Sequence, residues 1–277
     1  MNDKGYELGN GMVMTLARIT SVSPRPDNFL RFRIQAPLIT RMRPRGLAPV
    51  FKIFTARNAG APVTLPTFDE HRLAVPSWES DPARPIARAY TALEFAPGTD
   101  SITFDALDLG ASGSWIHRAK VGDTVGAIGF KHELVLDENT ETLVIMGDRS
   151  ARPAITEILR ATPADLRTTV IDMDASGDTE NALRAALAEA DERTTVWIAG
   201  EVRRVAAGRE AALAHGITPT RVLSLPYWHE GLGREHYDRI LYRRYERAAA
   251  AGLPISNEET AARIELTPVS TAELQSS

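Results

Sequence analysis

Four consecutive residues, Arg88-Ala89-Tyr90-Thr91, combine side chains that could bind a charged, flat molecule. A segment that contains prolines precedes these residues, and apolar residues at alternate positions follow them. This pattern predicts a β-strand that begins after a loop. On a strand Arg88 and Tyr90 share one face, and Thr91 points to the other. A guanidinium can bind a phosphate through two hydrogen bonds, a phenol ring can stack on a flat ring system, and a hydroxyl or amide can bond a ring nitrogen. This set suits a flavin nucleotide, and an ordinary solvated edge strand is the alternative interpretation.

The composition limits the classes of protein and of chemistry. The chain has 277 residues, of which 43% are hydrophobic and 25% charged, as in a globular protein long enough for two cores. The net charge of −4 disfavours broad nucleic-acid binding. The sequence contains no apolar run of membrane-spanning length and no hydrophobic signal core after Met1, so we expect a cytoplasmic protein without a membrane span. We also expect a monomer. The absence of cysteine excludes disulfides, thiolate nucleophiles and Cys-ligated metal or iron–sulfur sites, so electron chemistry would need an organic cofactor or a partner.

The elements that would position these residues change character along the chain. Up to about residue 135, short segments alternate apolar and polar residues between turns that contain proline or glycine, which predicts a six-stranded antiparallel β-barrel. The six segments are 16–20, 30–34, 50–54, the strand around Tyr90, 102–104 and 125–128. A long, proline-rich excursion from Arg57 to Pro85 interrupts them, and loops of this kind are usually functional or mobile.

The following hundred residues have a different period. Nearly continuous apolar runs at 142–146, 169–172, 195–199 and 222–225 alternate with helical stripes, which predicts a parallel, doubly wound α/β sheet. The stripes are Ala154/Ile155/Ile158/Leu159 after Pro153, Leu183/Ala186/Leu187, and Val202/Val205/Ala206/Leu213 before Gly216. We therefore predict a β-barrel domain at 12–138, an α/β domain at 139–252, and a C-terminal tail at 253–277 that is either a loosely packed helix or disordered.

A β-barrel with Arg-x-Tyr-Thr followed by a parallel α/β domain is the layout of the ferredoxin–NADP reductase superfamily. Within it, the sequence resembles the siderophore-interacting proteins, bacterial FAD-containing ferric-siderophore reductases. The resemblance covers about residues 16–242 and has five motifs in order. They are Arg88-Ala-Tyr-Thr91, Gly110-Ala-Ser-Gly-Ser-Trp115 with Val121-Gly-Asp-Thr-Val125, Gly147-Asp-Arg-Ser-Ala-Arg-Pro-Ala-Ile155, Trp197-Ile-Ala-Gly-Glu201, and Pro226-Tyr-Trp-His-Glu-Gly231.

The resemblance implies an FAD site in the barrel. Arg88 would hold the pyrophosphate, Tyr90 would stack on the isoalloxazine, and Thr91 would bond near its N5. Small residues before a short helix would let backbone N–H groups approach the phosphates, although an ordinary turn with a helix cap is the alternative for that loop. The residues assigned to FAD are Arg88, Ala89, Tyr90, Thr91, Gly110, Ser112, Gly113, Ser114 and Trp115.

The resemblance also implies an NAD(P)H site and a substrate site. Gly147-Asp148 and Gly200-Glu201 end two parallel strands and could border the nucleotide, although strand-end glycines chosen for turn geometry are an equal alternative and no Gly-x-Gly-x-x-Gly is present. Lys52 and Lys131 occupy basic positions that would face an anionic ferric siderophore. His229 stands where the family has a third, arginine, position and would be a weaker, pH-dependent charge.

Three departures and two rival functions accompany this interpretation. Leu93 and Gly113 replace an arginine and a serine of the family, which could weaken FAD binding, and Arg149 adds charge near the nucleotide positions. The expected activity is electron transfer from NAD(P)H or a reduced carrier such as ferredoxin, through FAD, to the Fe(III)–siderophore, with no side chain acting as a nucleophile. The rivals are a general NAD(P)H:flavin oxidoreductase on the same fold and a non-catalytic siderophore- or flavin-binding protein.

Other polar clusters have simpler explanations. Six arginines lie at 25, 31, 33, 41, 43 and 45, but Arg31 and Arg33 alternate with apolar residues and fit the solvated face of a strand better than a nucleic-acid site. The six histidines lack the spacings of metal ligands, so we expect no metal site.

Overall fold

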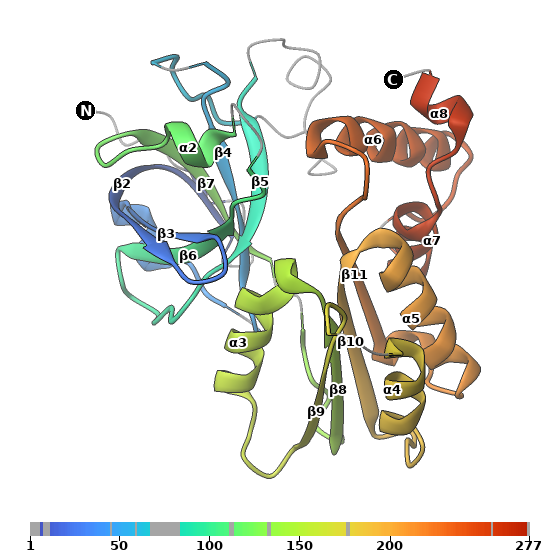
Figure 1. Cartoon of the computed structure of the whole chain (residues 1–277). Helices are drawn as coiled ribbons and strands as arrows, with labels where there is room; N and C mark the ends of the chain where they lie inside the picture. Colours follow the sequence, from blue (N-terminus) through green and yellow to red (C-terminus); the bar gives the residue numbers. More distant parts are fainter. Residues whose placement is uncertain are drawn as a thin grey trace. The chain divides into compact units, whose positions relative to one another are not determined.

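The computed structural model describes residues 6–7, 12–44, 46–58, 60–66, 84–110, 114–131, 134–175, 178–255 and 257–275 (Figure 1). The chain divides into two units, Met1–Val135 and Leu136–Ser277. No helix in these described ranges is both long enough and apolar enough to cross a membrane.

The first unit is built on one antiparallel sheet, in which the strands follow the order β5-β4-β7-β2-β3-β6 and β1 pairs with β2. A bridge between Leu93 and Thr103 joins the segment after β5 to β6, at opposite ends of that order. The six predicted barrel strands are thereby confirmed. The bounds are β1 (Tyr6–Glu7), β2 (Val13–Arg25), β3 (Phe29–Gln35), β4 (Val50–Thr55), β5 (Ile86–Thr91), β6 (Ser101–Leu107) and β7 (Thr124–Lys131), with a 3-10 turn η1 (Pro37–Arg41) and a short helix α2 (Trp115–Arg118).

Aromatic side chains fill the centre of this sheet. In β6 every second residue is buried, so Phe104 points inward, where its ring stacks on Phe32 with centroids 5.4 Å apart. Trp115, the first residue of α2, packs on Phe32 at 5.0 Å. Because α2 contributes Trp115 to this core, the position of the helix is fixed relative to the sheet.

The second unit is a parallel sheet of order β11-β10-β8-β9, with α3 on one face and α4 and α5 on the other (Figure 1). The four predicted parallel strands and the doubly wound arrangement are confirmed. The bounds are β8 (Thr142–Gly147), η2 (Arg149–Ala151), α3 (Arg152–Ala161), β9 (Arg167–Asp172), α4 (Thr179–Ala186), β10 (Thr194–Glu201), α5 (Val202–Ala214), η3 (Pro219–Arg221) and β11 (Val222–Trp228).

The helix boundaries have local causes. Pro153 lies in the first turn of α3, where its missing N–H costs no hydrogen bond. Gly216 follows α5 with φ of +91°, a conformation that favours glycine. One detail of the sequence analysis is wrong: Leu159, expected in the buried stripe of α3, is 44% exposed. The buried position is instead taken by Glu157, which accepts two hydrogen bonds from Arg160.

Residues after 252, for which we predicted either a loosely packed helix or a disordered tail, form two helices in this unit. α6 (Arg234–Ala250) precedes α7 (Glu258–Leu266) and α8 (Thr271–Gln275). Arg244 on α6 is only 8% exposed. Its guanidinium donates to both carboxylate oxygens of Glu273 and to the backbone carbonyls of Ile264, Thr267 and Pro268. A buried polar side chain thus contributes several of the hydrogen bonds that hold the segment, and an apolar pattern does not show such contacts.

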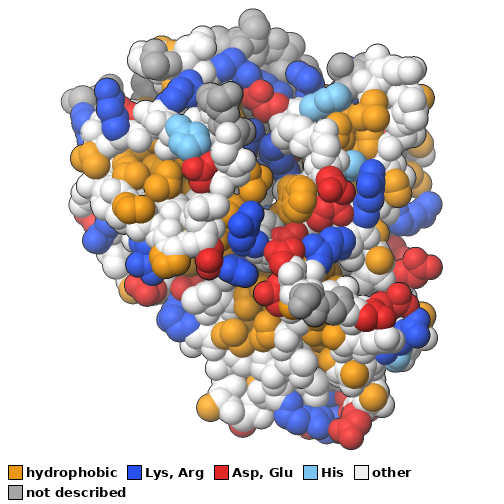
Figure 2. All heavy atoms as spheres, in the orientation of Figure 1, with side chains coloured by type: hydrophobic (Ala, Val, Ile, Leu, Met, Phe, Trp, Pro, Cys, Tyr) orange, Lys and Arg blue, Asp and Glu red, His pale blue; other side chains and the backbone are white. Residues whose placement is uncertain are grey.

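Charged side chains on the face drawn in Figure 2 are of both signs and interspersed. The described arginines of the N-terminal cluster follow this pattern: Arg31 forms a bidentate pair with Asp105, and Arg33 donates to Ser101. These contacts support the interpretation of a solvated strand face.

Candidate functional site

The Arg88-to-Thr91 segment is the strand β5, and Tyr90 is its most constrained side chain. The Tyr90 hydroxyl accepts a hydrogen bond from Trp115 Nε1 at 3.0 Å, and its ring packs on Phe104 with centroids 4.8 Å apart. Burial raises the pKa of Tyr90 to about 12, although the Trp115 hydrogen bond and the Arg88 charge oppose that shift. The ring nevertheless stays only half-buried. Tyr90 is thus a fixed, neutral aromatic surface with an exposed part.

The cross-strand register separates the predicted basic residues from Arg88 and Tyr90. Tyr90 is opposite Phe51, which is buried in the core, whereas Lys52 is opposite Ala89. Residues opposite one another on antiparallel strands point to the same side, so Lys52 lies on the other face of the sheet from Tyr90.

The second lysine joins the first. Lys131, which is exposed, pairs with Val50, two positions from Lys52 and on the same face. Val50 is in turn opposite Thr91. The structure therefore brings Lys52, Lys131 and Thr91 to one face of β5, β4 and β7, and Arg88 and Tyr90 to the opposite face.

The loop before α2 is described only at its two ends. Gly110 has φ of +72°, and its N–H donates to Asp108 Oδ1 at 2.8 Å. Ser114 precedes the first residue of α2, Trp115, so the short helix begins where we predicted it. Ser112 and Gly113 lie outside the described residues. A glycine at positive φ lets the backbone approach a ligand closely, and a fixed aromatic surface can stack on a flat ring, so the described residues fit a flavin nucleotide.

In the second unit Asp148 joins three strand ends. It follows β8 and is 2% exposed. Its Oδ1 accepts from the Ser150 N–H at 2.8 Å and from the Ser150 hydroxyl at 2.5 Å. Its Oδ2 accepts from the Glu201 N–H at 2.8 Å, at the end of β10, and from Trp228 Nε1 at 2.8 Å, at the end of β11. The structure thus brings the predicted Gly147-Asp148 and Gly200-Glu201 pairs together at the carboxyl edge of the sheet, where strand order reverses and α/β proteins bind ligands.

Gly200 is required by this arrangement. Its φ is +144°, and a Cβ atom there would lie 2.4 Å from Asp148 Oδ2. Glu201 in turn caps α5, because its Oε2 accepts from the N–H groups of Arg203 and Arg204 at 2.7 and 3.2 Å. Both carboxylates are thus engaged with the protein's own N–H groups. Turn geometry, the alternative that the sequence left open, explains Gly200 directly.

His229, the third predicted substrate position, is a buried side chain in the second unit. The side chain is 5% exposed and packs on Tyr237 with ring centroids 5.4 Å apart. Its Nδ1 donates to the Glu230 carbonyl oxygen at 2.7 Å, since a carbonyl can only accept. Burial by α6 removes the imidazole from the surface of this unit.

A further ionic cluster lies beside β8, at the end of β9. Asp174 accepts from the Arg149 N–H at 2.6 Å and from the Arg204 guanidinium at 3.0 Å. Burial opposes ionisation of Asp174, but these two donors together lower its pKa. The sequence analysis noted Arg149 for its charge. In the structure its backbone N–H donates a hydrogen bond to the Asp174 carboxylate.

Sequence reasoning assigned no role to Trp228 or Ser150, although both lie within quoted motifs. The available signal was their position directly after a predicted strand, at the edge where ligands bind. No cluster of three His, Asp or Glu suited to a metal ion occurs in the described part of the chain.

The fold defines a class of protein. An antiparallel barrel followed by this parallel sheet is a ferredoxin reductase-like fold, and phthalate dioxygenase reductase superposes with a TM-score of 0.51 at 13% identity, covering 78% of this chain and 68% of that one. No protein-family profile matches the sequence.

Within that class, the chain has the fold of the siderophore-interacting proteins. The protein from Acinetobacter baumannii superposes with a TM-score of 0.63 at 18% identity over 86% of this chain and 99% of that one. The protein from Aeromonas hydrophila gives 0.61 at 20% identity over 82% and 95%. In sequence, the chain is 25% identical over 217 residues to the ferric vibriobactin reductase of Vibrio cholerae, covering 67% of this chain and 78% of the relative. The resemblance that the sequence motifs indicated is confirmed.

Proposed function

We propose that this protein is an FAD-dependent ferric-siderophore reductase. The sequence similarity to a relative named as a ferric reductase supports this function. The observation that carries the proposal is the state of Tyr90, a half-buried ring held by Trp115 on a strand that also bears Arg88. Electrons would come from NAD(P)H or from a reduced carrier protein such as ferredoxin.

The described residues have separate roles in this proposal. Arg88 binds the pyrophosphate and Tyr90 provides the stacking surface. Thr91, whose side chain points to the other face of the sheet, bonds the ring system near N5 through its backbone N–H. When bound, FAD accepts a hydride and delivers single electrons, which joins a two-electron donor to a one-electron acceptor. The protein orients the cofactor and substrate, and no side chain needs to act as a nucleophile.

The basic face accounts for substrate binding. Lys52 and Lys131 share that face with Thr91, the residue assigned to the reactive part of the flavin. An anionic ferric siderophore is attracted there, and the substrate's iron is released after reduction because anionic oxygen ligands hold Fe(II) less strongly than Fe(III). Since His229 is buried in the other unit, these two lysines supply the positive charge.

The donor would bind the second unit. Gly147 and Gly200 lie at the carboxyl ends of β8 and β10, on either side of the reversal in strand order. Ligands of open α/β sheets enter at this place. Buried Asp148 and Glu201 already accept hydrogen bonds from N–H groups at this edge. Their role in the proposal is therefore to hold Gly200 and the start of α5 in the arrangement that receives the nucleotide.

An anaerobic titration tests the function. The purified protein is saturated with FAD, reduced with NADH, NADPH or a reduced ferredoxin, and then mixed with a ferric siderophore and a chromogenic Fe(II) chelator. We expect flavin absorbance to bleach with a donor and return with the iron complex while the Fe(II) colour appears. Bleaching without faster reoxidation by the siderophore than by an uncomplexed Fe(III) salt indicates a general flavin oxidoreductase. A protein that binds no FAD refutes the assignment of β5 and leaves the binding-protein interpretation.

A further inference from the structure

We propose that Trp228 is a ligand-contacting residue, an aromatic platform for a planar ring at the carboxyl edge of the α/β sheet. This inference rests on the proposed function, because it concerns the ligands of the same protein. The planar ring is either the nicotinamide of the donor or an aromatic ring of the siderophore.

Trp228 lies at the carboxyl edge of the α/β sheet. It is the last residue of β11 and pairs with Glu201, the last residue of β10, after a register shift between Gly200 and Glu201. Strand β10 borders the reversal of strand order, where the crevice for ligands lies. Trp228 is thus one strand away from that crevice and at the same edge.

The indole of Trp228 is held in place by a hydrogen bond to Asp148. Its Nε1 donates to Asp148 Oδ2 at 2.8 Å, and Asp148 is almost fully buried. A hydrogen bond to a carboxylate is stronger than one between neutral groups. The same carboxylate is itself fixed by Ser150 and by the Glu201 N–H, so the indole cannot turn without breaking that bond.

Part of the Trp228 ring remains accessible to a ligand. Trp228 is only half-buried although its polar atom is satisfied, which leaves aromatic surface rather than a polar group exposed. A rigid indole stacks on flat rings at little cost in side-chain entropy. By contrast, neighbouring His229 is buried against Tyr237 and offers no such surface.

Asp148 is then a positioning residue that acts through Trp228. Its carboxylate sets the orientation of the indole and touches no ligand itself. If Asp148 acts through Trp228, removing the charge of Asp148 weakens ligand binding only in a protein that still has the indole. If Asp148 is merely structural, the same change weakens binding in the W228A protein as well.

Binding of redox-inert probes to the full-length, FAD-loaded protein tests the proposal without relying on turnover. The probes are NAD⁺, NADP⁺ and a Ga(III)-catecholate siderophore, measured by isothermal titration calorimetry. We expect W228A to weaken at least one probe about tenfold or more. W228F, which keeps a ring but loses the hydrogen bond to Asp148, should weaken that probe less than W228A does and about as much as D148N does. The matched control is Y242A, an exposed aromatic on α6.

The results separate the two ligands and the two proposals. Loss for the nucleotides alone identifies a nicotinamide platform, and loss for the gallium complex alone identifies a siderophore contact. Equal affinities of W228A and the wild type, in proteins with matching melting temperatures, overturn the inference, as does a wild type that binds none of the probes. D148N should weaken binding in the wild-type background and leave W228A unchanged. Failure of iron reduction alone refutes the function but not this contact.

Discussion

Trp115 Nε1 donates to the Tyr90 hydroxyl across 3.0 Å, so the first residue of α2 fixes the half-buried aromatic ring of β5. Trp115 is 5% exposed, and water cannot readily replace a lost acceptor there. The Y90F variant should therefore lose about 1–3 kcal/mol in free energy of unfolding, measured by urea denaturation, because it leaves the buried Nε1–H of Trp115 without an acceptor. The ring remains, so the FAD content of the purified protein should be close to that of the wild type. A Y90L protein should retain little FAD, and equal retention by both variants argues against stacking.

The contact between Gly200 and Asp148 makes the next prediction. A methyl group at residue 200 would meet Asp148 Oδ2 at 2.4 Å, and φ there is +144°. G200A should be destabilised by about 1–3 kcal/mol from backbone strain alone, and the displaced carboxylate should release Trp228. Near-ultraviolet circular dichroism and acrylamide quenching should report a more mobile indole. Gly233 provides the control, since a Cβ atom there meets nothing within 4 Å. An unchanged tryptophan signal in a destabilised G200A protein would separate the two effects.

The basic face predicts a charge-specific effect on the substrate. Reversing the charge in K52E should raise the KM for an anionic ferric siderophore up to about fivefold per disrupted ion pair, and the effect should shrink at high salt. The rate of FAD reduction by the donor should not change. Lys120, also exposed in the first unit, gives the matched variant K120E. If K120E changes the KM as much as K52E, net charge and not the basic face governs binding.

The arginine at the centre of the C-terminal helices predicts a pH dependence. Arg244 is the main cause that holds the pKa of Glu273 far below its ordinary value, against a smaller opposing effect of burial. A depressed carboxylate pKa adds stability above the unfolded value of 4.5, and this stability is lost progressively as pH falls below it. The protection factors of the amide hydrogens in α7 and α8, which correct for the intrinsic slowing of exchange in acid, should therefore fall from about pH 4.5 downward.

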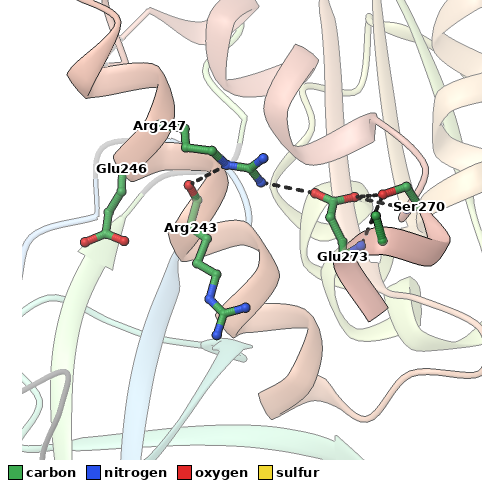
Figure 3. Close-up of a pocket in the computed structure, with 6 residues that line it drawn as sticks. Arg243, Glu246, Arg247, Ser270 and Glu273 are labelled. Atoms are coloured by element: carbon green, nitrogen blue, oxygen red, sulfur yellow. Dashed lines mark hydrogen bonds and ion pairs between the residues drawn. The ribbon is translucent and has the colours of Figure 1, made fainter. Parts of the chain in front are cut away.

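Variants at the same pair check this cause. R244A should destabilise these helices by about 3 kcal/mol, because it leaves several carbonyls and a carboxylate without their donor. R244K keeps the charge but not the planar fork, so its effect should be intermediate. E273Q should abolish the acid-dependent step. Neighbouring Arg247 also reaches Glu273 at 3.4 Å, from the rim of a pocket lined by both acidic and basic side chains (Figure 3). R247A should nevertheless have a small effect, since Arg247 is largely exposed.

The sequence predicted what local patterns encode. The alternation of Ile102, Phe104 and Ala106 defines β6 by itself, and Pro153 and Gly216 mark helix ends wherever they occur. The burial of His229 could not be predicted, because it depends on Tyr237, on a helix whose packing no short pattern records. For the same reason Arg244, in a polar stretch, gave no sign that its guanidinium organises the final helices. Asp148 was located correctly, but only the structure shows that its oxygens face the protein's own donors.

The hydrogen bonds of Asp148 also have a consequence for how the molecule is made. They join residues 53 and 80 positions apart in the chain, to Glu201 and to Trp228. Contacts of such long range form late, after loop closure has been achieved by the intervening strands and helices. Because domains fold as the chain emerges during synthesis, this edge of the sheet must await the synthesis of Trp228. The first unit can acquire its fold earlier, so the FAD that we propose for it would meet a nascent chain before the proposed nucleotide would.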